Sequence, residues 1–112
     1  MAIHLLSGPA KADEVADMLS ALGDYIKVAV DIERGILAGG GVMHADCERV
    51  LLDDGSRQGD LWGGDWLPQE RKVRYSSMIN IRPAQNSRST EVQNASIRST
   101  MERIIVSTLG GG

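Results

Sequence analysis

The sequence predicts an α+β fold, a roll in which a four-stranded antiparallel sheet is flanked by helices on one side, in the order ααββββαα. Apolar residues recur with helical spacing near both ends of the chain, and they alternate with polar residues in the middle. Clusters of Gly, Asp and Pro separate these segments. With 112 residues, 42% of them hydrophobic, the chain can bury one core, so we expect a single domain over residues 1–112.

Two helices are predicted in the first third of the chain. The first lies between Pro9 and Gly23, because its apolar residues stand at i, i+3, i+4 and i+7. Asp24 can cap a second helix over residues 25–34, whose apolar side chains cover most of the circumference, and Gly35 can end it. The short connection predicts a helical hairpin with a largely buried second helix.

Four strands are predicted to follow. The first runs over residues 36–43 and bends at its three glycines, and a phosphate loop is disfavoured there because no Lys-Ser or Lys-Thr pair follows. Residues 50–52 and 61–66 form a central hairpin around a turn at residues 53–56. Period-two alternation places Trp62 and Trp66 on one face of its second strand. The fourth strand covers residues 71–81.

An arm is expected at the N-terminus, and a helix followed by a disordered tail is expected at the C-terminus. Residues 1–8 form an N-terminal arm or an edge strand. A polar loop over residues 84–88 leads to a short helical turn at Thr90 and to a last helix capped by Asn94. Its buried face carries Ile97, Met101, Ile104 and Ile105. Residues 110–112, all glycine, are expected to be a disordered tail.

Charge and cysteine content narrow the class of protein. Twelve Lys and Arg against fifteen Asp and Glu give a net charge of −3, which argues against a dedicated nucleic-acid binder. The one cysteine, Cys47, cannot form an internal disulfide, and residues 1–6 lack the features of a signal peptide, so a cytoplasmic protein is expected. No run approaches the roughly 20 apolar residues of a membrane span, so no membrane partner is expected. A monomer is feasible.

One candidate for chemistry is the pair His44 and Cys47 together with nearby aspartates. A zinc site would need a second ligand pair at matching spacing, and the other histidine, His4, is forty residues away. Aspartates near turns have a structural explanation, because they bond to their own backbone. We therefore expect no metal, no cofactor and no catalytic residue. A small hydrolase-like enzyme remains the alternative, with His44, Cys47, Asp53, Asp54, Asp60 and Asp65 converging in one cleft.

The second candidate is a polar segment that follows the fourth strand. Arginine forks suit carboxylates and phosphates, amides add hydrogen bonds, and tryptophan supplies an apolar surface. The same side chains can instead satisfy the backbone of a loop. The predicted binding residues are Trp62, Trp66, Asn80, Arg82, Gln85, Asn86 and Arg88. A third cluster, Arg71, Lys72 and Arg74, is expected to protect an exposed strand from aggregation.

Several blocks carry a family resemblance. They are residues 24–27 and 30–34, the glycines before residues 44–48, residues 51–58 with Trp62-Gly63 and Asp65-Trp66, and residues 79–83 with Gln85-Asn86. Together they resemble a small family of domains of unknown function common in cyanobacteria. The resemblance implies an α+β roll with helices on one side of a four-stranded sheet and a link to the regulation of biofilm development, with no catalytic activity.

We therefore expect a non-catalytic regulatory or interaction protein. Its partner, a protein or a small molecule, would be held by an apolar pocket near the tryptophans and by the charged loop from Arg82 to Arg88. The terminal glycines also raise the possibility of a ubiquitin-like modifier. A predicted helix leading into the tail, in place of a strand, argues against it.

Overall fold

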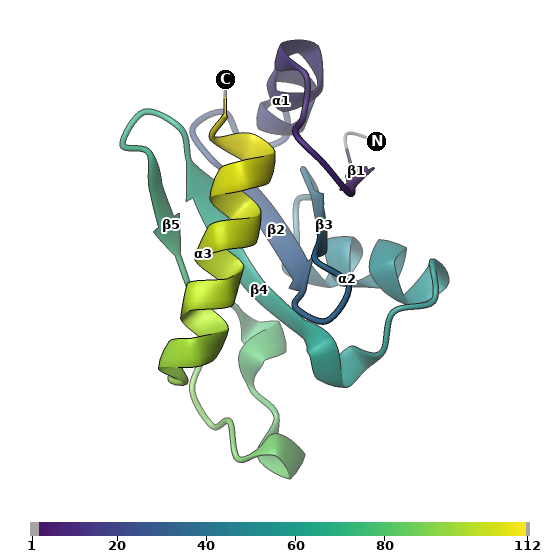
Figure 1. Ribbon diagram of the computed structural model, residues 1–112, viewed down its shortest axis with the longest axis vertical. Coiled ribbons are helices and arrows are strands. Elements are labelled where there is room, and N and C mark those ends of the chain that lie inside the picture. The colour runs from purple at the N-terminus through teal and green to yellow at the C-terminus, as the bar shows by residue number, and fades with distance from the viewer. Residues whose placement is uncertain (1–2, 112) are drawn as a thin grey trace.

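A five-stranded antiparallel sheet forms the centre of the protein, and the computed structural model describes residues 3–111 (Figure 1). The strands lie in the order β1-β3-β2-β4-β5, and the helices are α1, α2 and α3. The α+β class is confirmed, but the predicted four strands and the order ααββββαα are wrong in detail. The bounds are β1 (His4–Leu6), α1 (Ala12–Leu19), β2 (Ile26–Asp31), β3 (Ile36–Gly39), α2 (His44–Asp53), β4 (Leu61–Leu67), β5 (Lys72–Arg74) and α3 (Ala95–Leu109).

The segment predicted as the second helix is the central strand of the sheet. β2 pairs with β3 through Val28 and Gly39 and with β4 through Val28 and Gly64. Both faces of β2 are covered, so its sequence reads as a continuous apolar run with no clear period. Asp31 and Gly35 belong to the hairpin turn, in which the Asp31 carboxylate accepts the backbone N–H groups of Glu33 and Arg34, each at 2.9 Å.

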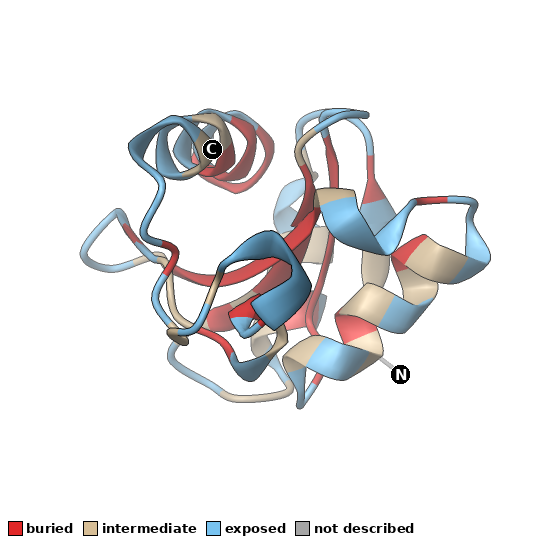
Figure 2. Cartoon of the chain, turned by 90° about the horizontal axis from the view of Figure 1, so that it is seen from below, coloured by how far each residue is buried: buried red, intermediate tan, exposed pale blue. Residues whose placement is uncertain are grey.

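The helices cover both faces of the sheet, not one as expected. Figure 2 shows the buried strands between α3 on one side and α2 on the other. α1 lies on the same face as α3, since the Ala10 N–H donates to Thr108 O at 2.8 Å and Met18 joins the core beneath α3. The two cores are unequal. The α1 and α3 face holds the two tryptophans and most of the large aliphatic side chains, while the α2 face holds Ala29, Ile36, Ala38, Cys47, Leu51 and Leu61.

The predicted central hairpin is wrong in its first strand. Residues 50–52 lie in the last turn of α2, because Cys47 and Leu51 bury one stripe of that helix at i and i+4. Gly55, at φ +100°, ends the helix, and the Ser56 N–H donates to Leu51 O at 3.0 Å. The turn residues were therefore identified correctly, but they end a helix.

The second strand of that hairpin is confirmed as β4. Trp62, Gly64 and Trp66 share the face that packs on α3, and both indoles are buried. A Cβ on Gly64 would lie 2.6 Å from the backbone oxygen of Arg74, so β5 can approach only because this residue is glycine.

The long fourth strand predicted over residues 71–81 ends early. Only Lys72–Arg74 pair as β5, and Met78–Asn80 form a 3₁₀ turn. The segment around Thr90 runs alongside, in place of the predicted helical turn, and Ser76 forms an isolated bridge with Glu91.

The C-terminal helix is confirmed, with its cap. The Asn94 side chain accepts the Ile97 N–H at 3.0 Å, and Met101, Ile104 and Ile105 are buried. Gly110, expected in a disordered tail, is buried at the end of α3 and accepts a hydrogen bond from Arg71. Gly112 lies outside the described residues, as do the first two residues of the expected arm, whose later residues form β1 on the edge of β3.

Candidate functional site

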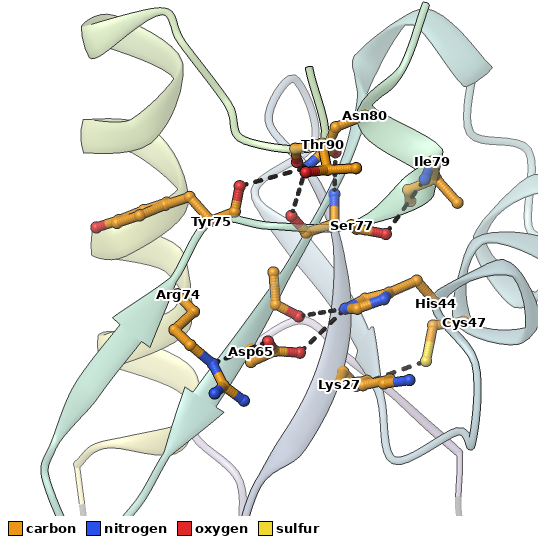
Figure 3. Close-up of polar contacts among 12 residues, drawn as sticks. Lys27, His44, Cys47, Asp65, Arg74, Tyr75, Ser77, Ile79, Asn80 and Thr90 are labelled. Carbon is orange, nitrogen blue, oxygen red and sulfur yellow. Dashed lines mark hydrogen bonds and ion pairs between the residues drawn. The ribbon is translucent and has the colours of Figure 1, made fainter.

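The Asn80 side chain forms hydrogen bonds with the edge of β4, beyond the point where β5 ends (Figure 3). Its side chain accepts the Gly63 N–H at 2.8 Å and donates to Gly63 O at 3.0 Å, so one carboxamide replaces a strand residue. It also donates to Thr90 O at 2.9 Å, which ties the returning segment to the sheet. Asn80 is fully buried, and its hydrogen bonds are made within the protein. The structure therefore gives this predicted binding residue a scaffolding position beneath the surface.

Arg82 anchors the loop that follows. Its guanidinium donates to the carbonyl oxygens of Ile79 at 3.0 Å and Gln58 at 2.8 Å, and to that of Leu61. It also lies over the Trp62 ring, 4.5 Å from the centroid. Burial lowers the pKa of Arg82 from its ordinary value, while the negative charge of Glu48 acts in the opposite direction. Among the ion pairs of the described residues, none includes Arg82.

The loop and the start of α3 enclose a pocket of about 270 Å³, which we call the amide pocket. Three predicted binding residues, Trp62, Gln85 and Asn86, meet there. Asn86 has φ +59°, a left-handed conformation that asparagine tolerates better than most residues. The wall combines four carboxamides with apolar groups, and it contains no charged side chain. The complete lining is Trp62, Gln85, Asn86, Ser87, Val92, Gln93, Asn94 and Ile97.

Some polar groups of the residues that line the amide pocket form hydrogen bonds within the part of the protein that the structure describes, and the Trp62 indole N–H does not. Gln85 accepts from Arg82 at 3.3 Å and donates to Gly59 O at 3.1 Å, and the Ser87 hydroxyl donates to Asn80 O at 2.6 Å. The buried indole N–H of Trp62 has no hydrogen-bond partner among residues 3–111. Buried donors without partners are rare in folded proteins, so this one calls for an explanation.

Two predicted binding residues lie elsewhere. Trp66 is almost fully buried in the core beneath α3, where Arg71 lies over its ring at 5.8 Å. Arg88 is exposed and does not line the amide pocket. Conversely, Ser87, Val92, Gln93, Asn94 and Ile97 line the pocket but were not predicted as binding residues. Gln93 and Asn94 were recognised only as helix caps, although the density of amides from residue 80 to 94 was a usable signal.

The residues of the alternative site occupy the opposite face of the sheet. His44 Nε2 lies 3.0 Å from Asp65 Oδ1 and 2.9 Å from Gly64 O, so this nitrogen carries the proton and donates (Figure 3). Asp65 also accepts from Arg74 Nε at 3.2 Å. His44, Asp65 and Arg74 thus join the start of α2 to β4 and β5. This structural role accounts for their contacts without any catalytic role.

Cys47 is a poor nucleophile in this setting. Its thiol lies 3.6 Å from Lys27 O, to which it donates (Figure 3), and burial raises its pKa to about 11. The thiolate is the reactive form, so the folded protein holds Cys47 in its unreactive state near neutral pH. Asp53 and Asp54 instead pair with Arg49 and Arg34, at 3.4 and 2.7 Å. Asp60 lies 4.0 Å from Arg57, so the predicted cluster does not converge in one cleft.

The basic cluster near β5 is engaged with the protein itself. Arg71 donates to Gly110 O, and Arg74 pairs with Asp65 and lies 4.8 Å from the centre of the Tyr25 ring. Lys72 is exposed on the edge strand, the position at which a charge limits strand addition.

Metal binding and membrane insertion are two further functions to consider for the described residues. Within residues 3–111, no three His, Cys, Asp or Glu side chains are grouped so that they could hold a metal ion. Of the helices in the same part of the chain, none has both the length and the apolar character needed to cross a bilayer.

Comparison with known proteins identifies a family. Residues 4–108 match the family described as "Protein of unknown function (DUF5674)". No curated protein and no solved structure matches the chain. The match covers almost the whole chain, and every strand of the sheet and all three helices fall within it except Leu109, the last residue of α3. The chain therefore belongs to the DUF5674 family of proteins of unknown function.

Proposed function

We propose that this protein is a non-catalytic regulatory module that binds its ligand in the amide pocket. The observation that carries the proposal is a pocket whose wall combines four carboxamides with the apolar side chains of Trp62, Val92 and Ile97. Binding sites of small ligands combine such apolar surface with a few polar groups that fix orientation.

The state of the competing residues supports a binding role over hydrolysis. The Cys47 thiol is buried and its pKa is raised, and the Asp65 carboxylate is held by Arg74 as well as by His44. A nucleophile, its base and an open cleft are the parts a hydrolase needs. Among five surface pockets of residues 3–111, none is lined by His44 or Cys47.

The process served by the module is proposed from the family resemblance. The family that the chain resembles is linked to biofilm development in cyanobacteria, so regulation of that process is the proposed role. The ligand would be an unidentified protein or small molecule. The amide pocket, rather than the exposed Arg88, is the proposed point of contact.

Variants that change only the pocket wall test this proposal. Asn86→Gly removes one carboxamide and keeps the left-handed backbone, and Gln93→Ala removes an exposed one. Arg88→Ala is the matched control, because Arg88 is also exposed and lies outside the pocket. Folding would be checked by circular dichroism, and function by complementation of a biofilm phenotype in a host lacking its own copy.

We expect the double variant Asn86→Gly, Gln93→Ala to fold normally and fail to complement, while Arg88→Ala complements. A folded double variant that complements as well as the unchanged protein would exclude the amide pocket as the functional site.

A further inference from the structure

Two methionines are unusually exposed for apolar side chains. Met78 is 74% exposed and Met43 is 59% exposed, whereas Met18 and Met101 are 0% exposed in the core beneath α1 and α3. A methionine thioether can be oxidised to a sulfoxide, and the reactivity of a protein sulfur follows its accessibility. The structure therefore divides the methionines of residues 3–111 into an accessible pair and a protected pair.

Both accessible methionines stand where a helical segment begins. Met43 is the N-cap residue of α2, and its carbonyl accepts the Asp46 N–H at 3.1 Å. Met78 is the first residue of a 3₁₀ turn, and its carbonyl accepts the Ile81 N–H at 3.1 Å. The protein thus holds the backbone at both positions and leaves the side chains to solvent. A change at either sulfur leaves these hydrogen bonds in place.

The two segments contribute to the same small core. Cys47 and Leu51 of α2 and Ile79 of the 3₁₀ turn pack together on the α2 face of the sheet. Val42, next to Met43, is 60% exposed as well. Methionine is a common residue on surfaces that bind partners, where its oxidation disrupts the contact. Oxidation of the exposed pair exchanges apolar for polar surface beside α2.

The cysteine sulfur is withdrawn from oxidants. Cys47 is 0% exposed, its thiol donates to Lys27 O at 3.6 Å, and burial raises its pKa to about 11. Oxidation of a cysteine starts from the thiolate, so both the burial of Cys47 and its protonated state protect it. A thioether needs no deprotonation. At neutral pH the exposed methionines are therefore the most reactive sulfurs of residues 3–111.

We propose that Met43 and Met78 are sites of reversible oxidation by a peroxide, which makes the surface beside α2 more polar and leaves the fold intact. The proposal goes beyond the proposed function, since neither methionine lines the amide pocket.

The chemistry of the step is a two-electron oxidation of sulfur. A sulfur lone pair attacks one oxygen of hydrogen peroxide and the O–O bond breaks, so the thioether becomes a sulfoxide and the second oxygen leaves as water. A methionine sulfoxide reductase reverses the step. Two thiols then supply the electrons and become a disulfide, and the sulfoxide oxygen leaves as water.

Peptide mapping measures each site separately. Trypsin cleaves after Lys and Arg but not before Pro, so the five methionines fall in five peptides, residues 1–11, 12–27, 35–49, 75–88 and 99–103. The whole protein is treated with hydrogen peroxide at neutral pH, either folded or in denaturing urea. Each added oxygen raises the mass of a peptide by about 16 Da. Cys47 shares a peptide with Met43, and fragmentation of that peptide separates the two.

We expect Met43 and Met78 to be oxidised at rates within about threefold of their rates in urea. Met18 and Met101 should react at least about tenfold more slowly in the folded protein than in urea, and Cys47 should stay reduced. Oxidation should shift the melting temperature by less than about 3 °C. A methionine sulfoxide reductase with dithiothreitol should remove both added oxygens.

Leucine variants isolate the effect on the surface. Met43→Leu, Met78→Leu keeps apolar side chains of similar volume and removes both exposed sulfurs. Peroxide should shorten the retention of the unchanged protein on a hydrophobic-interaction column and leave that of the double variant unchanged. Met18→Leu makes the same substitution at a buried position. This matched control should respond to peroxide as the unchanged protein does.

Four results would overturn the inference. Oxidation of Met18 or Met101 as fast as that of Met78 would mean that the core is open to oxidants. Oxidation of Cys47 ahead of the methionines would reverse the proposed order of the sulfurs. Unfolding of the oxidised protein, or unchanged retention after both sulfoxides have formed, would show that oxidation does not act on the surface alone.

Discussion

The guanidinium of Arg82 lies 4.5 Å from the centre of the Trp62 ring, and this contact joins the polar loop to the sheet. Arg82 follows the 3₁₀ turn at Met78–Asn80, whereas Trp62 stands on β4. The arginine satisfies three backbone carbonyls, and the tryptophan forms one wall of the amide pocket. The loop that shapes the pocket is thus held by buried polar contacts.

Replacing Arg82 should destabilise the fold. Arg82→Ala leaves the carbonyls of Gln58, Leu61 and Ile79 without this donor, and we expect a loss of about 3 kcal/mol in the free energy of unfolding. Urea denaturation followed by tryptophan fluorescence measures it. Arg88→Ala, at an exposed position, should change stability by less than about 0.5 kcal/mol. Equal stability of the two variants would contradict the anchoring role.

Replacing Asn80 should destabilise the fold about as much as replacing Arg82. Asn80→Ala removes the acceptor for the Gly63 N–H and the donor to Gly63 O and Thr90 O, at a buried site. We expect a cost of about 2 to 4 kcal/mol, together with faster hydrogen exchange at the Gly63 amide. Unchanged protection of that amide would mean that another group satisfies the edge of β4.

Gly64 should not tolerate a side chain. In Gly64→Ala the new Cβ would lie 2.6 Å from Arg74 O, which is backbone and cannot turn aside, so β5 must move. We expect a loss of about 1 to 3 kcal/mol in thermal or urea unfolding. Gly59→Ala is the control, because its Cβ would meet its nearest neighbour at 3.8 Å. A Gly64→Ala protein as stable as Gly59→Ala would show that β5 is loosely held.

Cys47 should resist alkylation while the protein is folded. Because burial raises its pKa from 9.0 to about 11, the thiolate fraction at pH 8 is about a hundredfold smaller in the folded protein than in the unfolded chain. Iodoacetamide labelling, measured by mass spectrometry with and without denaturing urea, checks this. Rapid labelling of the folded protein would mean that the thiol is accessible and ionised.

The same shift predicts a pH dependence of stability. A group whose pKa is raised by folding contributes stability that is complete below its unfolded pKa, here 9.0, and is lost as the pH rises through about 11. Tyr75, whose pKa burial and Glu102 raise to about 12, adds a later loss that begins near pH 10. We expect the stability of Cys47→Ala to fall less steeply between pH 9 and 11 than that of the unchanged protein. Parallel curves for the two proteins would contradict the role assigned to Cys47.

Local chemistry explains which parts of the site and fold were predictable. Asn94 was identified as a helix cap and Gly55 as part of a turn, because caps and turns depend on a few adjacent residues. Trp62, Gln85 and Asn86 were selected for their side chains, and they do meet in one pocket. Their meeting with Gln93 and Ile97 depends on where α3 packs, which no local pattern reveals.

The sequence by itself determined the class of the fold, the amphipathic helices α1 and α3, the strand β4 with both tryptophans on one face, and the positions of the turns. Only the tertiary structure decided that residues 26–31 form a strand and residues 50–52 a helix, and that helices cover both faces of the sheet. An element covered on both sides is apolar throughout, so its sequence loses the period that separates strand from helix. The same packing buried Arg82 and Asn80 against β4, because the early end of β5 left backbone groups of β4 that these side chains satisfy.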